Sequence, residues 1–126
     1  MASSTTRHAP NPTPRRGDIW QVDLGRPIGA EIIKRRPAVV MSSDSVGVLP
    51  LKLVVPLTGW QSSFSGKIWL VRIPVARVTG LTKESTADVL QMQSVTLERF
   101  VTRLGRMPAN LLDEIAAAIA ASVEYQ

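Results

Sequence analysis

Two side chains at the ends of apolar segments could carry phosphate chemistry. Arg36 directly precedes the run PAVVM at residues 37–41, and Thr58 follows the run LVV at residues 53–55 after two intervening residues. Both runs are rich in β-branched residues and predict short buried strands. If the strands are sheet neighbours, Arg36 and Thr58 face each other at one rim, where a guanidinium fork and a hydroxyl can bind phosphate oxygens. Taken alone, the spacing also fits an exposed arginine and a threonine that ends a strand.

The elements that must position this pair are mostly strands. Apolar runs predict strands at residues 19–24, 37–42, 51–56, 67–73 and 86–93, and residues 94–101 stay open between a strand and a helical turn. Loops rich in glycine, proline or polar residues separate them at residues 25–35 and 59–66. Helical spacing of apolar residues predicts one helix over 108–122, with Asn110 as its N-cap. The expected fold is mainly β (α+β), a small barrel with a C-terminal helix.

The ends of the chain differ from the middle in composition. Residues 1–14 combine Ser, Thr, Asn and Pro with almost no large apolar side chain, which predicts a disordered leader before one domain at 15–126. No apolar run reaches the roughly 18 residues of a membrane span, and no signal-peptide segment opens the chain. We therefore expect a cytoplasmic protein that has no membrane partner.

Charge and residue counts narrow the chemistry. The chain has 126 residues, a net charge of +5 and no cysteine, which excludes disulfides, thiolate catalysis and cysteine-ligated zinc. His8 is the sole histidine, so one chain cannot supply a paired-histidine ribonuclease mechanism, and no cluster has metal-ligand spacing. All 15 Lys and Arg residues and seven acids precede Met107, so the part before it carries 15 − 7 = +8. This excess favours a polyanion partner, although many basic proteins bind something else.

A series of motifs has the order and spacing of one known family. The motifs are GDIWQVDL at 17–24, GAE at 29–31, RPAVV at 36–40, VVPLT at 54–58, GLTKES at 80–85, Gln91 and RLGRM at 103–107. This series resembles the MazF/PemK/Kid family, the endoribonuclease toxins of type II toxin–antitoxin modules, from about Arg16 to the C-terminus. The resemblance implies an SH3-like β-barrel with a C-terminal helix and a two-fold homodimer. It also implies metal-independent, sequence-specific cleavage of single-stranded RNA such as mRNA, which inhibits translation, and a cognate antitoxin with an acidic, partly disordered segment.

The resemblance also assigns roles to individual residues. Arg36 and Thr58 match the catalytic arginine and threonine of the family, and Asp23, Glu31 and Gln91 match positions that line its RNA groove. Glu31 could orient Arg36, accept a hydrogen bond from a base or act as a base, and it could equally be a solvated loop acid. No cofactor is implied.

The sequence departs from the family pattern beside two of these positions. Ile32 follows Glu31, where the family usually has glutamine. The family pattern here is acid, glutamine, apolar residue and base, whereas residues 90–93 read LQMQ. Leu90 thus replaces the acid and Gln93 replaces the base, so both charges are absent. Asp88 is a candidate replacement for the acid. We therefore expect the reaction to be retained and the RNA target to differ.

Aromatic residues in the second loop supply candidate stacking surfaces for bases. Trp60, Phe64 and Lys67 could bind substrate by stacking and by phosphate contact. Trp69 and Trp20 lie within apolar strand patterns, which favours burial.

Two other functions remain open at this stage. One is a barrel that binds nucleic acid or protein without cutting, and the other is a gyrase poison of the CcdB kind. Arg36 together with Thr58 favours the endoribonuclease, because binding alone does not need that pair.

Overall fold

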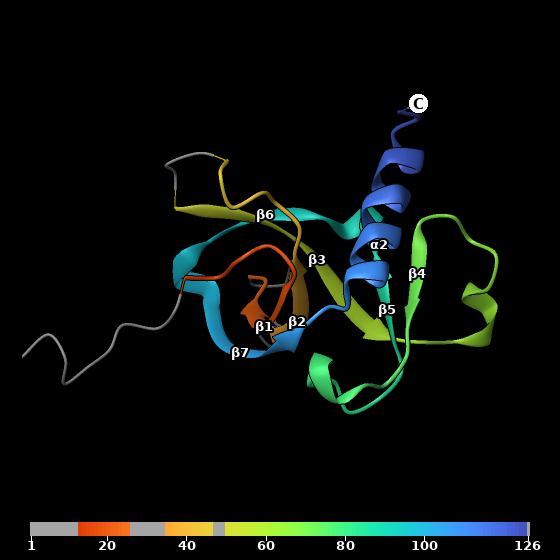
Figure 1. Ribbon diagram of the computed structural model, residues 1–126, viewed down its shortest axis with the longest axis horizontal. Coiled ribbons are helices and arrows are strands. Elements are labelled where there is room, and N and C mark those ends of the chain that lie inside the picture. The colour runs from red at the N-terminus through yellow and green to blue at the C-terminus, as the bar shows by residue number, and fades with distance from the viewer. Residues whose placement is uncertain (1–12, 26–34, 47–49, 126) are drawn as a thin grey trace, which may run out of the picture.

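The fold is built mainly on strands in the computed structural model, which describes residues 13–25, 35–46 and 50–125. Within them the strands are β1 (Asp18–Asp23), β2 (Arg35–Val40), β3 (Leu51–Gly59), β4 (Leu70–Ile73), β5 (Ser85–Asp88), β6 (Gln93–Thr96) and β7 (Phe100–Arg106) (Figure 1). Short 3-10 turns are η1 (Ser62–Phe64), η2 (Arg77–Thr79), η3 (Val89–Gln91) and η4 (Leu97–Arg99), and the chain closes with helix α2 (Ala109–Ser122). The predicted class, mainly β with a C-terminal helix, is confirmed.

The strands form one antiparallel sheet with an open path. Its order is β4-β5-β3-β2-β1-β7, and β6 pairs with the first half of β3. Strands β4 and β7 stand at the two ends of this path. The predicted closed barrel is therefore not confirmed. Closure depends on how far strands curve toward each other, which local hydrophobic patterns do not encode.

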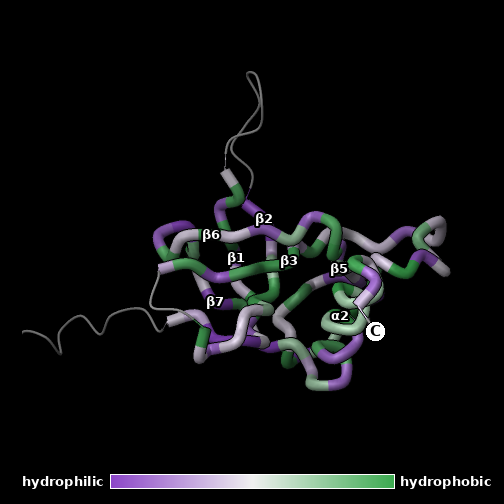
Figure 2. The backbone as a smooth tube through the Cα atoms, turned by 90° about the horizontal axis from the view of Figure 1, so that it is seen from above, coloured by the Kyte–Doolittle hydropathy of each residue, from purple (hydrophilic) through white to green (hydrophobic). Residues whose placement is uncertain are grey.

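The two faces of the sheet bury two separate apolar clusters. Successive strand residues point to opposite faces, so Ile19 and Val39 pack on the side of α2, whereas Trp20 and Ala38 pack on the other side. Figure 2 shows β3 as a largely hydrophobic strand through the middle of the molecule. The larger cluster includes Ile115 of the helix, which is fully buried. Burial of such a side chain stabilises the fold by about 1.5–3 kcal/mol, so α2 is fastened to the sheet chiefly by its apolar stripe.

Helix α2 has nearly the predicted bounds, but its N-cap lies two residues before the predicted one. Pro108 is the N-cap residue, and its carbonyl accepts hydrogen bonds from the backbone N–H groups of Leu111 and Leu112. The predicted N-cap, Asn110, lies inside the helix and is wrong for that reason. Proline suits a helix start because its fixed φ matches the turn and its missing N–H would have no helical partner.

The strands predicted at 67–73 and 86–93 are shorter than expected. Strand β4 starts only at Leu70, because the N–H groups of Lys67 and Leu70 bond within the preceding turns. The segment 86–93 is wrong as a single strand, since η3 separates β5 from β6. The ambiguous segment 94–101 divides into the end of β6, the turn η4 and the start of β7.

Several predictions fall largely outside the described residues. The predicted leader is described only at Thr13 and Pro14, and the loop predicted at 25–35 only at its two ends. Both therefore stay predictions, as does the domain boundary at residue 15. Within the described ranges, no helix has the length and apolar character that a membrane crossing requires.

Candidate active site

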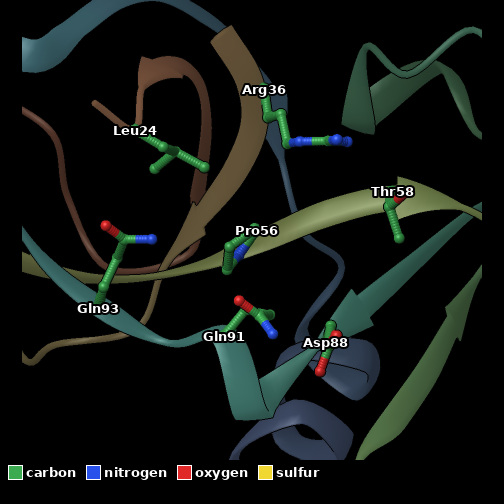
Figure 3. Close-up of a pocket in the computed structure, with 7 residues that line it drawn as sticks. All are labelled: Leu24, Arg36, Pro56, Thr58, Asp88, Gln91 and Gln93. Atoms are coloured by element: carbon green, nitrogen blue, oxygen red, sulfur yellow. The ribbon is translucent and has the colours of Figure 1, made fainter. Parts of the chain in front are cut away.

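Arg36 and Thr58 lie opposite each other at the edge of the sheet. The paired residues of β2 and β3 end at Ala38 and Pro56. Continuing the same antiparallel register by two residues along each strand would bring Arg36 opposite Thr58. Figure 3 shows the guanidinium of Arg36 extending in the direction of Thr58. Both side chains line a pocket of about 250 Å³. The other lining residues are Leu24, Pro56, Asp88, Gln91 and Gln93. The two residues expected at one rim thus line one pocket.

Gln91 reaches this pocket because the strand that pairs with β3 is interrupted. Leu57 pairs with Ala87 in β5, whereas Val54 pairs with Gln93 in β6. Three residues back along β3 thus correspond to six along the partner segment, and the three extra residues form η3. Gln91 therefore lies in a 3-10 turn. The sequence had predicted a strand at this position.

Asp88 fixes the start of that turn and also lines the pocket. Its Oδ1 atom accepts a hydrogen bond of 3.2 Å from the backbone N–H of Leu90. It is the one carboxylate among the lining residues, beside the amides of Gln91 and Gln93. Leu90 is 61% exposed and does not line this pocket. The family has an acid at the position of Leu90, and in this chain Asp88 brings a carboxylate to the pocket instead. That it replaces the family acid stays a prediction.

A second pocket, of about 190 Å³, shares Arg36 and Thr58 with the first. Its other lining residues are Arg35, Pro37, Leu57, Gly59, Leu81, Thr82, Lys83 and Ser85. Pro56 lines the first pocket and Leu57 the second, and consecutive strand residues point to opposite faces. Arg36 and Thr58 therefore form a shared wall at the sheet edge. Sequence reasoning missed this pocket, although the GLTKES motif places a lysine among hydroxyl residues.

Asp23 is not brought to the first pocket, although its neighbour Leu24 is. The Oδ1 atom of Asp23 accepts a hydrogen bond of 3.0 Å from the N–H of Gly25 and lies 4.0 Å from a guanidinium nitrogen of Arg99. Arg99 also donates to the carbonyl of Asp23. These contacts hold the end of β1 and the chain that leaves it.

Trp60 and Phe64 belong to a loop that stands apart from both pockets. The two rings meet edge to face with centroids 5.9 Å apart, and the guanidinium of Arg72 lies 4.8 Å from the Trp60 ring centroid. Lys67 instead lies 5.7 Å from the ring centroid of Trp69. One face of Trp60 is therefore occupied by Arg72. Trp69 packs partly buried against the larger cluster and Trp20 is buried, as the sequence indicated.

A bidentate ion pair supports this loop. Arg72 donates to both carboxylate oxygens of Glu84, at 2.6 and 3.1 Å. This hydrogen bonding holds the pKa of Glu84 below its ordinary value and raises the pKa of Arg72. Both side chains are exposed to solvent, so the pair orients the guanidinium over Trp60 more than it stabilises the fold.

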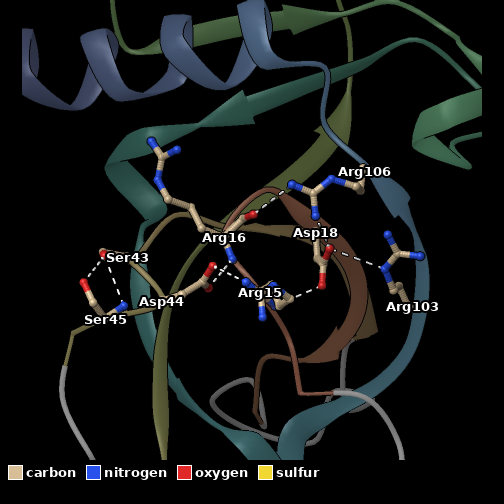
Figure 4. Close-up of polar contacts among 8 residues, drawn as sticks. All are labelled: Arg15, Arg16, Asp18, Ser43, Asp44, Ser45, Arg103 and Arg106. Atoms are coloured by element: carbon tan, nitrogen blue, oxygen red, sulfur yellow. Dashed lines mark hydrogen bonds and ion pairs between the residues drawn. The ribbon is translucent and has the colours of Figure 1, made fainter.

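The first residue of β1, Asp18, is the centre of a polar network. It lies at the other end of the strand from Val22, which pairs with Arg36. Its carboxylate is only 5% exposed and accepts from Arg106 at 2.8 Å, while Arg103 lies 3.4 Å away (Figure 4). The second oxygen accepts from the N–H of Arg15 at 2.9 Å and from the indole of Trp20 at 3.4 Å. This network joins the start of the domain to β7.

Some predicted site residues lie outside the described residues. Glu31, Ile32 and the rest of 26–34 are not described, so their roles stay predictions. In the parts of the chain that the structure describes, no three His, Cys, Asp or Glu side chains are grouped to hold a metal ion.

The comparisons with known proteins agree with this fold. The model of the PemK-like, MazF-like toxins of type II toxin–antitoxin systems matches residues 15–123, and the chain belongs to that family. Endoribonuclease MazF9 of Mycobacterium tuberculosis is 35% identical over 112 residues, which cover 83% of this chain and 92% of the relative. Endoribonuclease MazF6 of the same species is 28% identical over 104 residues, 79% and 88% of the two chains.

Solved structures share the fold. MazF from Deinococcus radiodurans superimposes with a TM-score of 0.72 at 22% identity, covering 90% of this chain and 99% of that one. A mycobacterial endoribonuclease in complex with its cognate antitoxin gives a TM-score of 0.70 at 17% identity, covering 90% and 97%. The family resemblance and the endoribonuclease prediction made from the sequence are confirmed.

Proposed function

We propose that this toxin is a metal-independent, sequence-specific endoribonuclease that cleaves single-stranded RNA, including mRNA, and so inhibits translation. The observation that carries the proposal is the position of Arg36 opposite Thr58 in the wall of an open pocket. The curated endoribonuclease relatives do not favour the alternatives of a non-catalytic barrel or a gyrase poison.

The reaction is a transesterification within the RNA, with water as the acceptor and the donor of protons. The 2′-oxygen attacks phosphorus and gives its proton to water, the bond from phosphorus to the 5′-oxygen breaks, and that oxygen takes a proton from water, so no proton is gained or lost overall. The products are a 2′,3′-cyclic phosphate and a 5′-hydroxyl. Negative charge builds on the phosphorane oxygens, where the planar guanidinium of Arg36 offers matched donors and the Thr58 hydroxyl offers one more. Arg36 stays charged at neutral pH, so its role is electrostatic.

The rest of the first pocket suits a nucleobase. The amides of Gln91 and Gln93 each offer a donor and an acceptor, and Leu24 and Pro56 supply apolar surface. Single-stranded RNA is read by such contacts to base edges. Asp23, Glu31, Trp60, Phe64 and Lys67 remain proposed contacts for flanking nucleotides. A base stacked on a ring such as Trp60 would contribute about 1–3 kcal/mol.

The assembly of the toxin belongs to the same proposal. We place it in the cytoplasm as a homodimer, each protomer an SH3-like barrel, with β6 and β7 curving around the smaller apolar cluster. Val95 and Phe100 of those strands meet in that cluster, which supports the curvature. A cognate antitoxin would cover the basic groove with an acidic segment. The test is whether the product of the neighbouring gene blocks RNA cleavage. If it does not, the antitoxin assignment is wrong.

The test is cleavage of total RNA by purified protein in EDTA, with the cut ends sequenced. Arg36→Ala should abolish cleavage while the protein stays folded, and Thr58→Val should slow it about 10- to 1000-fold because one transition-state hydrogen bond is lost. Arg77→Ala is the matched control, since Arg77 is exposed in η2 and lines neither pocket. Undiminished cleavage by Arg36→Ala would refute the assignment of the active site.

A further inference from the structure

The pocket on the far side of the catalytic pair has the composition of an anion site. Three of its lining side chains are cationic, Arg35, Arg36 and Lys83. Three others carry hydroxyl groups, Thr58, Thr82 and Ser85, and none of the lining residues that the structure describes is acidic. The first pocket has one cation and one carboxylate in its lining. The two pockets therefore differ in charge although they share the same wall.

Lys83 lines this pocket, and hydrogen bonds hold the backbone around it. The Ser85 hydroxyl donates to the Lys83 carbonyl at 3.0 Å, and the N–H of Trp60 donates to the Glu84 carbonyl at 3.1 Å. The ammonium lies beside Gly59, where an added Cβ would be 3.7 Å from it. Glycine at this position leaves the space between Lys83 and the end of β3 open.

The acid next to Lys83 does not neutralise it. Both carboxylate oxygens of Glu84 accept from Arg72, on the outer side of the loop. Among the described residues, no carboxylate oxygen lies within 4.0 Å of the Lys83 ammonium. An exposed cation that lines the pocket and is not paired by these carboxylates is available to bind an external anion.

We propose that this second pocket binds the RNA phosphate next to the scissile one, with Lys83 as its principal counter-ion. The inference rests on the proposed function. An RNA strand whose scissile phosphate lies at Arg36 and Thr58 must extend away from these two residues in both directions. On one side it meets amides and apolar surface suited to a base, and on the other it meets cations and hydroxyls suited to a phosphodiester. Lys83 thus sets the direction of the strand across the catalytic pair.

The experiment combines a protein variant with a change in the RNA. A short RNA that the wild-type protein cuts is made with a neutral methylphosphonate at the linkage 5′ or at the linkage 3′ of the cut. Lys83→Met is compared with Lys52→Met, since Lys52 lines neither pocket. Kinetics are measured over a range of salt concentrations, and thermal unfolding checks that both variants fold.

Lys83→Met should lower kcat/KM about 10-fold, mainly through KM, and reduce the salt dependence by about one phosphate contact. One of the two methylphosphonates should lower the wild-type rate similarly, and Lys83→Met should then add no further loss on that RNA. Equal rates for Lys83→Met and Lys52→Met would overturn the subsite. Weaker antitoxin binding with unchanged RNA kinetics would also overturn it, in favour of an acidic peptide. A wild-type protein that cuts no RNA would refute the proposed function itself, and this subsite with it.

Discussion

The buried carboxylate of Asp18 should matter for stability and not for the reaction. Asp18→Asn keeps the shape of the side chain but removes its charge and turns one acceptor oxygen into an NH₂ group. In the wild-type protein one oxygen faces Arg106 and the other faces two N–H donors, from Arg15 and Trp20. Whichever way the amide turns, its NH₂ group meets a donor.

The cost follows from those contacts. A hydrogen bond to a charged group contributes about 1.5–3 kcal/mol, and a buried donor left without an acceptor costs about 1–3 kcal/mol. Asn retains part of the network, so we expect a loss of about 2–4 kcal/mol in the free energy of unfolding. For a domain of this size each kcal/mol lowers Tm by about 4–6 °C, so Tm should fall by about 10–20 °C.

Thermal unfolding followed by circular dichroism measures this loss, and RNA cleavage well below the new Tm measures function. Asp18 lines neither catalytic pocket, so cleavage per folded molecule should stay within about twofold of wild type. Asp113→Asn is the control, because Asp113 is an exposed acid on α2. A Tm for Asp18→Asn within about 2 °C of that control would refute the reasoning on buried partners.

Two further predictions concern backbone space and pH. Gly80 has φ +73°, and an added Cβ would lie 2.1 Å from the Leu104 carbonyl oxygen, so Gly80→Ala should destabilise by about 2–5 kcal/mol in chemical denaturation. Gly66→Ala has open space and should cost only about 1 kcal/mol; equal effects would contradict the steric argument. The pKa of Glu84 is lowered by Arg72, so the stabilisation from this pair is present above the ordinary pKa and lost as pH falls below about 4. Arg72→Met should move the Glu84 midpoint in an NMR titration upward, and an unmoved midpoint would argue against the hydrogen bond as its cause.

The sequence predicted the catalytic wall better than its surroundings. The runs at 37–41 and 53–55 are uniformly apolar, so their strand type and the position of Arg36 and Thr58 near the strand ends follow from local pattern. That these two strands are neighbours was a condition, which the pairing of β2 with β3 meets. The turn η3 did not follow, because Val89 and Leu90 continue an apolar pattern that a strand would share. Its position depends on the two registers of β3 with its partner segment, which are long-range facts. The second pocket likewise assembles residues from three separate segments.

The η3 turn contributes a side chain, Gln91, to the first pocket and takes no part in the two ladders that pair with β3. Ladders on both sides of it are complete without its three residues. Val89 is buried in the larger apolar cluster, whereas Leu90 and Gln91 are exposed, so the framework depends on Val89 and not on the other two. Substitutions of the same length there can alter which RNA fits while the catalytic wall keeps its geometry. A single scaffold can in this way diversify its targets among related chains without a matching loss of stability.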